Sequence, residues 1–318
     1  AQGKTLTVAA DAKRLNIRAN AQVVNNGTIL VCGAPGTSHG YVMIPSDGEL
    51  TGNALSVPEG KILSKNANSY YAGEALFEIT YADGSTKLSS ETIDVNSDTV
   101  QVKLLKDVTV GSWTLSQAAD DFVLDLGGHT LNGSTTSSYY VLYAGVSMTI
   151  KNGTIKYNGT AGKGAICAYG GKTLTIENSV TIDGGDGICI MMQDSAPTVI
   201  LNGTVTTAGE YGLTSNGSAN ADGNPDTCNI IVNNGATIRV PNGIAIYHPT
   251  LGTVTINGGE ISGHTGVEMC AGHLVVNGGN ITSTGKNWDA TGSQNAIKDG
   301  AAISIINRNY PGGTPTAE

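Results

Sequence analysis

The sequence is poor in charge and in most aromatic residues. Only 14% of the 318 residues are charged, and two Phe and two Trp stand against twelve Tyr. The chain contains no apolar run of the roughly 20 residues that a membrane-spanning helix needs. With 17 Lys and Arg, 26 Asp and Glu and a net charge of −9, it also lacks the dense positive charge that nucleic acids and anionic membranes attract. We therefore expect no nucleic-acid partner and no membrane insertion.

Cysteine is scarce and follows no metal-binding pattern. The five cysteines are an odd number, and none is spaced as a CxxC pair. We interpret them as small buried apolar side chains. The sequence also contains no GxSxG, HExxH or phosphate-binding loop. We predict no metal site and no cofactor.

Glycine is abundant, and the chain repeats itself. Gly accounts for 44 residues. A short apolar strand, an Asn-Gly turn and a second β-branched pair recur, as in Ile150-Lys-Asn-Gly-Thr-Ile155. The copies begin at residues 126, 150, 176, 200, 232, 256 and 276, which gives intervals of 24, 26, 24, 32, 24 and 20 residues. Self-similarity at such a period indicates a solenoid.

Each repeat also carries another strand signal after the second β-branched pair. Strands joined by turns at this period cannot all be hairpins, because a hairpin would reverse the chain. A coil in which each strand pairs in parallel with its equivalent one turn later satisfies the pattern. Parallel crossovers are right-handed. We predict an all-β fold, a right-handed parallel β-helix with about 20–32 residues per turn and an N-terminal β-rich extension.

The pattern changes along the chain in three steps. Residues 1–60 form a β-rich segment that resembles short solenoid coils. Residues 61–99 contain a β-hairpin with its turn at Asp83-Gly84, followed by a polar connector. Residues 100–318 are predicted to form the β-helix. The Asn-Gly pairs suit its corners, because Asn and Gly tolerate positive φ and stacked Asn side chains can hydrogen-bond along the coil.

Two segments carry a family resemblance. Residues 104–110 followed by 123–133, and the ending at 302–313, resemble secreted right-handed parallel β-helix proteins of anaerobic gut-type bacteria, which are pectate-lyase-like solenoids. The resemblance covers roughly residues 100–318. It implies an extracellular or cell-wall-attached protein, in some cases linked to adhesion. It supplies no catalytic motif to transfer.

One outward face of the coil is predicted to be apolar and aromatic. If the β-branched residue at the start of each strand in this second set of strand signals points inward, two columns point outward. They comprise Leu142, Cys167, Cys189, Thr214, Ala245, Glu268 and Lys298, and Ala144, Tyr169, Met191, Asn216, Tyr247, Cys270 and Gly300. This face is either covered by residues 1–90 or by long loops, or it is an open groove. In the second case Tyr169, Met191 and Tyr247 are candidate ligand-binding residues.

Two further features of the same region are open to more than one interpretation. Cys167 and Cys189 are predicted to share a column in adjacent turns, which allows either a disulfide or two free thiols. The insertion at residues 282–295 contains Trp288 in a polar setting. We interpret Trp288 either as a ligand contact or as part of a lid packed on the coil.

The acidic residues do not form an evident catalytic cluster. Glycoside hydrolysis requires two carboxyl groups, and the outward columns contain one acid, Glu268. Asp183 and Asp186 lie at one corner, which is a tight turn or a calcium site. A polysaccharide-active enzyme would have to combine Asp183, Asp186 and Glu210.

Together these features favour a non-enzymatic extracellular or cell-surface protein that binds a glycan or a host or surface protein, as an adhesin-like module. A polysaccharide lyase or glycoside hydrolase of the β-helix type is the first alternative. A structural rod or filament subunit is the second. It is suggested by residues 303–306, which read as a strand without a polar cap, so that the natural chain continues or end-to-end self-association covers that end.

Overall fold

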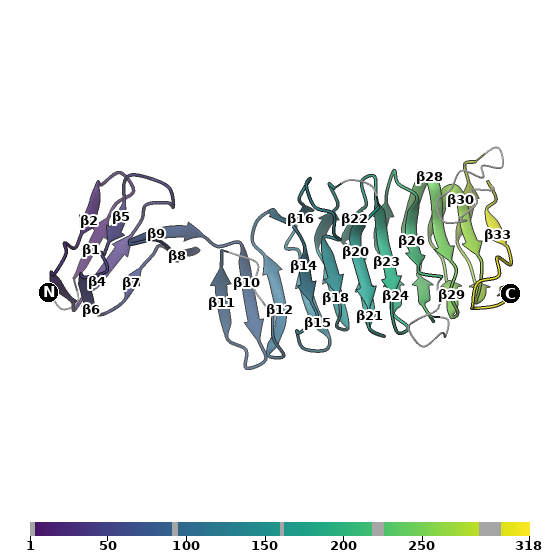
Figure 1. Cartoon of the computed structure of the whole chain (residues 1–318), viewed down its shortest axis with the longest axis horizontal. Helices are drawn as coiled ribbons and strands as arrows, with labels where there is room; N and C mark the ends of the chain where they lie inside the picture. Colours follow the sequence, from purple (N-terminus) through teal and green to yellow (C-terminus); the bar gives the residue numbers. More distant parts are fainter. Residues whose placement is uncertain (1–3, 91–94, 160–161, 218–225, 286–299) are drawn as a thin grey trace. The chain divides into compact units, whose positions relative to one another are not determined.

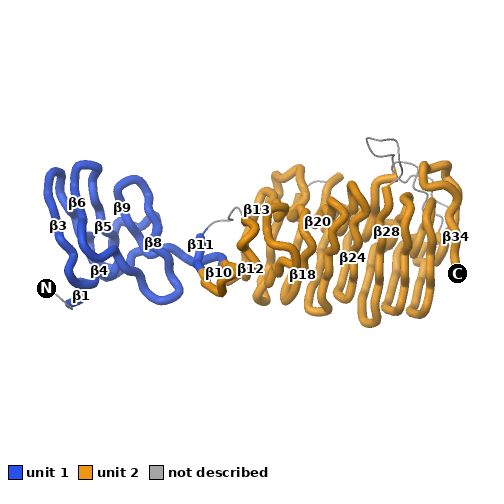
Figure 2. The backbone as a smooth tube through the Cα atoms, turned by 90° about the horizontal axis from the view of Figure 1, so that it is seen from below, with its two compact units in different colours: residues 1–78, 87–91 blue, residues 79–86, 92–318 orange. Residues whose placement is uncertain are grey.

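The computed structural model describes residues 4–90, 95–159, 162–217, 226–285 and 300–318. These residues contain no helix, and the chain forms a parallel β-solenoid of about 11 turns, which confirms the predicted β-helix. The chain divides into two compact units, residues 1–78 with 87–91 and residues 79–86 with 92–318 (Figure 2).

Unit 1 contains a short parallel coil. Its strands are β1 (Thr5–Val8), β2 (Arg14–Asn16), β3 (Gln22–Asn25), β4 (Thr28–Val31), β5 (Tyr41–Met43), β6 (Glu49–Gly52), β7 (Leu55–Ser56), β8 (Lys61–Asn66) and β9 (Ser69–Glu74). The pairs β1–β4, β2–β5, β3–β6 and β4–β7 are parallel, whereas β9 is antiparallel to both β5 and β8. Val8, Ile29, Val31 and Val42 form the buried core of this unit.

Strands β10 (Phe77–Tyr81) and β11 (Thr86–Ser89) lie at the boundary between the units. The turn between them is centred on Asp83-Gly84, where the side chain of Asp83 accepts hydrogen bonds from the backbone and the hydroxyl of Ser85. Gly84 has a φ of 82°, a value that glycine adopts without a side-chain clash.

Unit 2 stacks three columns of parallel strands (Figure 1). The first column contains β12 (Thr99–Leu104), β15 (Phe122–Asp125), β18 (Met148–Lys151), β21 (Thr173–Ile176), β24 (Thr198–Leu201), β27 (Asn229–Val232), β29 (Thr253–Ile256), β31 (His273–Val276) and β34 (Thr316–Ala317). The second contains β13 (Val108–Val110), β16 (Thr130–Gly133), β19 (Gly153–Lys156), β22 (Val180–Asp183), β25 (Thr204–Thr206) and the first half of β28 (Thr237–His248).

The third column carries the surface that contains the candidate functional site. It contains β14 (Trp113–Leu115), β17 (Leu142–Ala144), β20 (Gly164–Tyr169), β23 (Ile188–Gln193), β26 (Tyr211–Ser215) and the second half of β28. Strand β30 (Glu260–Met269) then pairs with β28, β32 (Asn280–Ser283) and β33 (Ile303–Ile305). Because β28 and β30 are long, they continue from the second column into the third.

The repeat fixes the inward side chains of the second column. One inward row consists of Leu131, Ile155, Ile182, Val205, Ile238, Ile261 and Ile281, each paired with the next. These are the second β-branched or apolar members of the seven sequence copies, so this alignment is confirmed. All of them except Ile281 are at most 1% exposed, and this continuous apolar stack is the core of the unit.

The predicted corner chemistry is also confirmed. Asn152 has a φ of 59° and Gly259 a φ of 89°, as the corners of the coil require. Four asparagines on successive turns are hydrogen-bonded side chain to side chain at 2.9, 3.0 and 2.9 Å. This asparagine ladder consists of Asn202, Asn233, Asn257 and Asn277.

The register of the third column differs from the prediction. Leu142 pairs with Ile166 and points inward, and Ile166 pairs with Ile190. Cys167 therefore pairs with Met191 and not with Cys189. The Cys189 side chain is fully buried, with its thiol directed at the carbonyl of Thr206 at 3.1 Å. The prediction that the two cysteines share a column is therefore wrong, and both are free thiols.

Candidate functional site

One outward row of the third column crosses seven turns. We call it the central column. Its members lie on β17, β20, β23, β26, β28, β30 and β33, and each is paired with the member on the next of these strands. It consists of Tyr143, Cys167, Met191, Thr214, Tyr247, Glu268 and Ser304. Because alternate residues of a strand face opposite sides, the row lies outside the core formed by Ile166, Ile190 and Leu213.

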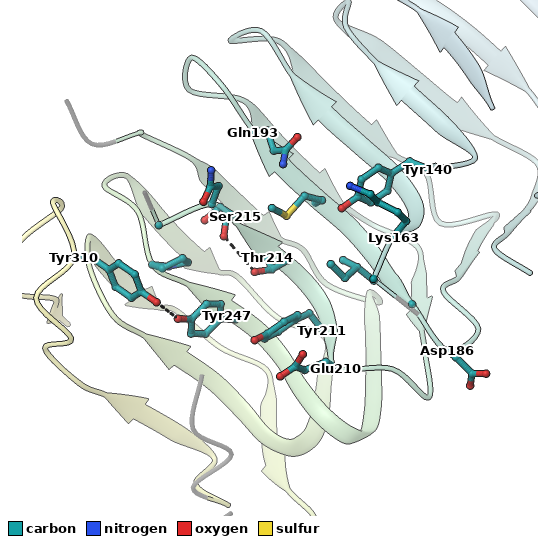
Figure 3. Close-up of a pocket in the computed structure, with 17 residues that line it drawn as sticks. Tyr140, Lys163, Asp186, Gln193, Glu210, Tyr211, Thr214, Ser215, Tyr247 and Tyr310 are labelled. Atoms are coloured by element: carbon teal, nitrogen blue, oxygen red, sulfur yellow. Dashed lines mark hydrogen bonds between the residues drawn. The ribbon is translucent and has the colours of Figure 1, made fainter. Parts of the chain in front are cut away.

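A cavity of about 680 Å³ lies over this row (Figure 3). We call it the tyrosine groove, after the four tyrosines in its lining, Tyr140, Tyr211, Tyr247 and Tyr310. Strands β23, β26 and β28 supply its floor. Lys163 and Tyr140 lie at one end, and Tyr310 comes from the segment that follows β33.

The aromatic part of the groove is centred on Tyr247. The rings of Tyr211 and Tyr247 stack with centroids 5.2 Å apart and planes tilted by 30°. The hydroxyls of Tyr247 and Tyr310 are 2.8 Å apart (Figure 3). Burial, followed by the nearby Cys270 thiol, raises the pKa of Tyr247 well above its usual 10.0. Its hydroxyl therefore stays neutral and can both donate and accept a hydrogen bond.

The opposite end of the groove is also aromatic and carries a cation. The ammonium group of Lys163 lies 5.6 Å from the ring centroid of Tyr140, within cation–π range. The Tyr140 ring meets that of Tyr143 edge to face, with centroids 5.7 Å apart. Burial is the main cause of the raised pKa of Tyr140. This end therefore presents a neutral phenol beside a positive charge.

Polar side chains complete the lining. Gln193 accepts the thiol proton of Cys167 at 3.5 Å, and Thr214 and Asn216 follow on the next turn. Exposed Asp186 and half-buried Glu210 line the groove on neighbouring turns. In Figure 3 the carboxyl group of Asp186 points away from that of Glu210. The groove thus offers hydrogen-bonding groups of several kinds around an aromatic floor.

The candidate residues from the sequence are distributed unevenly. Met191, Tyr247, Asp186 and Glu210 line the tyrosine groove. Tyr169 is not among the lining residues, and its ring packs edge to face with Tyr143, with centroids 6.5 Å apart. Trp288, Lys298 and the insertion around them lie outside the described residues.

Asp183, the third candidate carboxylate, belongs to a structural corner. It accepts the backbone N–H of Gly185 at 2.9 Å and pairs with Lys156 at 3.0 Å. Both contacts are accounted for by a tight turn between two strands. Among the residues that the structure describes, no group of three His, Cys, Asp or Glu side chains is arranged to hold a metal ion.

Several groove residues were not singled out from the sequence. Tyr140 and Lys163 precede their strands, Tyr211 is the first residue of β26, and Tyr310 is about 60 residues further along the chain than Tyr247. The excess of Tyr over Phe was the available signal, because a chain that uses aromatics only for packing has no need of twelve phenols.

No helix among the described residues is long and apolar enough to cross a membrane.

Comparison with known proteins identifies no family for this chain. No protein-family model, curated protein or solved structure matches the chain.

Proposed function

We propose that this chain is a non-enzymatic, extracellular or cell-surface β-helix protein that binds a glycan in the tyrosine groove. The observation that carries the proposal is the stacked pair Tyr211 and Tyr247 at the floor of a cavity whose rim is polar. Its extracellular location is supported by the resemblance of residues 100–318 to secreted β-helix proteins. The proposal requires no cofactor.

The chemistry of the lining suits a carbohydrate. A sugar ring has an apolar face of C–H groups and an edge of hydroxyls, so its site needs flat apolar area together with both donors and acceptors. Tyrosine supplies a rigid aromatic face and a neutral hydroxyl. Gln193 and Asn216 add amide donors and acceptors. A protein partner would also use aromatic anchors, but a concave cavity of about 680 Å³ is the size of a small-molecule or oligosaccharide site.

The test is binding to an array of neutral and acidic glycans, followed by calorimetry on the saccharide that binds best. We expect Tyr247→Ala to weaken binding roughly 30-fold, which corresponds to the ~2 kcal/mol of an aromatic hot spot. Tyr139→Ala is the matched control, because Tyr139 is 60% exposed and does not line the groove. Equal losses in both variants, or no bound glycan in the array, would refute the proposal.

The groove also contains a pair of acids that an enzyme could use. Two of the candidate acids, Asp186 and Glu210, line the same groove, and a polysaccharide hydrolase needs two carboxyl groups on either side of its substrate. The same glycan panel should therefore be assayed for new reducing ends and for unsaturated lyase products. We expect neither. Product formation that is lost in Glu210→Gln, with binding retained, would replace the binding function with catalysis.

A further inference from the structure

The central column does not end where the tyrosine groove ends. Beyond Tyr247 it continues to Glu268 and Ser304, which are 0% and 6% exposed. Met191, by contrast, is half-buried at the floor of the open groove. Side chains that point outward from the coil are therefore covered at this end. Arg308 and Tyr310, from the segment that follows β33, contact the column here.

We call residues 306–315, between β33 and β34, the strap. Its anchor is Arg308, whose guanidinium donates to the carboxylate of Glu268 at 2.7 Å. The Arg308 side chain is only 10% exposed and that of Glu268 is 0% exposed. A buried carboxylate is costly unless a cation is held against it. Glu268 is the one acid of the central column, so its position on this outward face is explained by the strap that it fixes.

The strap places Tyr310 across the line of the groove. Its hydroxyl lies 2.8 Å from that of Tyr247, and its ring packs against the buried cluster that contains Tyr211 and Tyr247. Gly217 also packs closely against Tyr310, because a Cβ added at Gly217 would lie 2.7 Å from the Tyr310 ring. Tyr310 therefore forms a wall at this end, and the groove does not continue along the column toward Ser304.

We propose that Tyr310 is a specificity-determining end wall, so that the groove accepts a chain end or a short oligosaccharide and not the interior of a long polysaccharide. This inference rests on the proposed glycan-binding function. From the turn of Lys163 to that of Tyr247 there are three steps between neighbouring strands, or about 14 Å at the usual strand spacing. A polymer that runs along the coil over this floor must stop at Tyr310.

The experiment measures how many protein molecules bind to one polysaccharide chain. The probes are cello-, xylo-, manno- and chito-oligosaccharides of increasing length and polymers of known chain length made of the same sugars. Calorimetry gives the affinity and the number of sites per chain. For the wild type we expect affinity to stop rising once the groove is filled, and no more than one protein for each chain end. For Tyr310→Ala we expect several proteins per chain and no loss of affinity for the polymer.

Two controls keep the result interpretable. Tyr310→Phe retains the ring and loses only the hydroxyl contact, so it should bind like the wild type in stoichiometry. Both variants leave Arg308 and Glu268 in place, so the strap remains anchored, and circular dichroism would verify that the coil is intact.

The outcomes separate this inference from the function on which it rests. Many wild-type molecules on one polymer chain would overturn the end wall and leave glycan binding standing. So would an unchanged stoichiometry in Tyr310→Ala. Tighter binding of every ligand, short and long alike, in Tyr310→Ala would show that Tyr310 is a plug that competes with the ligand, which also overturns the wall. No binding by any variant to any saccharide would mean that the proposed function itself had failed.

Discussion

Tyr247 combines the two kinds of interaction that the groove needs. Its ring stacks on Tyr211, and its hydroxyl contacts Tyr310. A phenylalanine would retain the first interaction and lose the second. Because burial raises the pKa of Tyr247 and keeps its hydroxyl neutral, the phenol remains a donor and an acceptor at neutral and mildly alkaline pH. This dual role accounts for the use of tyrosine at a position that is only 5% exposed.

Four of the five cysteines are buried, as the sequence suggested, whereas Cys32 is half-buried. Cys167, Cys189, Cys228 and Cys270 are at most 1% exposed. Burial is the first cause of a raised thiol pKa in all four, to about 12 for Cys167, about 11 for Cys228 and about 12 for Cys270, against a usual 9.0. These thiols are therefore protonated in the folded protein at neutral and mildly alkaline pH.

This burial predicts a loss of stability at high pH. Well below pH 9 the thiols are neutral in both the folded and the unfolded chain. Above it the unfolded thiols ionise while the folded ones stay protonated, so the free energy of unfolding falls by up to about 1.4 kcal/mol per pH unit for each thiol. Urea unfolding at pH 8 and pH 10 measures the fall. The double variant Cys167→Ala, Cys270→Ala separates thiols from tyrosines, because its stability should depend less steeply on pH. An equal slope would contradict the assignment.

At the scale of strands and corners, the sequence predicted the second column better than the third. The strands that carry the seven inward positions from Leu131 to Ile281 follow corners of nearly constant length, most of them Asn-Gly, so these positions align without error. Each strand of the third column follows a connection of variable length. The interval from Ile155 to Ile166, for example, is longer than that from Ile182 to Ile190. Variable connections leave the register of the next strand undetermined, which is why Cys189 was assigned to the wrong row.

The asparagine ladder is expected to contribute to stability in proportion to its bonds. Asn233 donates to Asn202 and accepts from Asn257, whereas Asn277 makes one ladder bond at the end of the row. We expect Asn233→Ala to lower the free energy of unfolding by about 2 kcal/mol and Asn277→Ala by about 1 kcal/mol or less, at roughly 1 kcal/mol for each hydrogen bond lost. Urea unfolding of both variants is the measurement. A larger loss at Asn277 would show that the corner matters for a reason other than the ladder.

At the scale of the whole molecule, a coil assembles its site from residues that no local motif could reveal. Met191 and Tyr247 could be singled out from the sequence because they occur in the repeat, at outward positions of the third strand. Tyr310 could not, because the strap is outside the repeat and lies beside Tyr247 only once residues 306–315 run back from β33 to β34. The same limit applies to Glu268, whose partner Arg308 is 40 residues further along the chain.

Exposed apolar side chains of β33 favour association of the coil with a second copy of itself. Strand β33 exposes Ile303 and Ile305, which are 39% and 46% accessible. Strands with exposed apolar side chains invite pairing with another chain. We expect the apparent mass to rise with concentration in light scattering, and Ile303→Lys with Ile305→Lys to abolish the rise because two charges would then face each other across the contact. Leu63→Lys, which replaces an apolar residue of similar exposure in unit 1, should leave association unchanged. A constant monomeric mass at all concentrations would exclude the rod and leave the groove as the feature to which a function can be assigned.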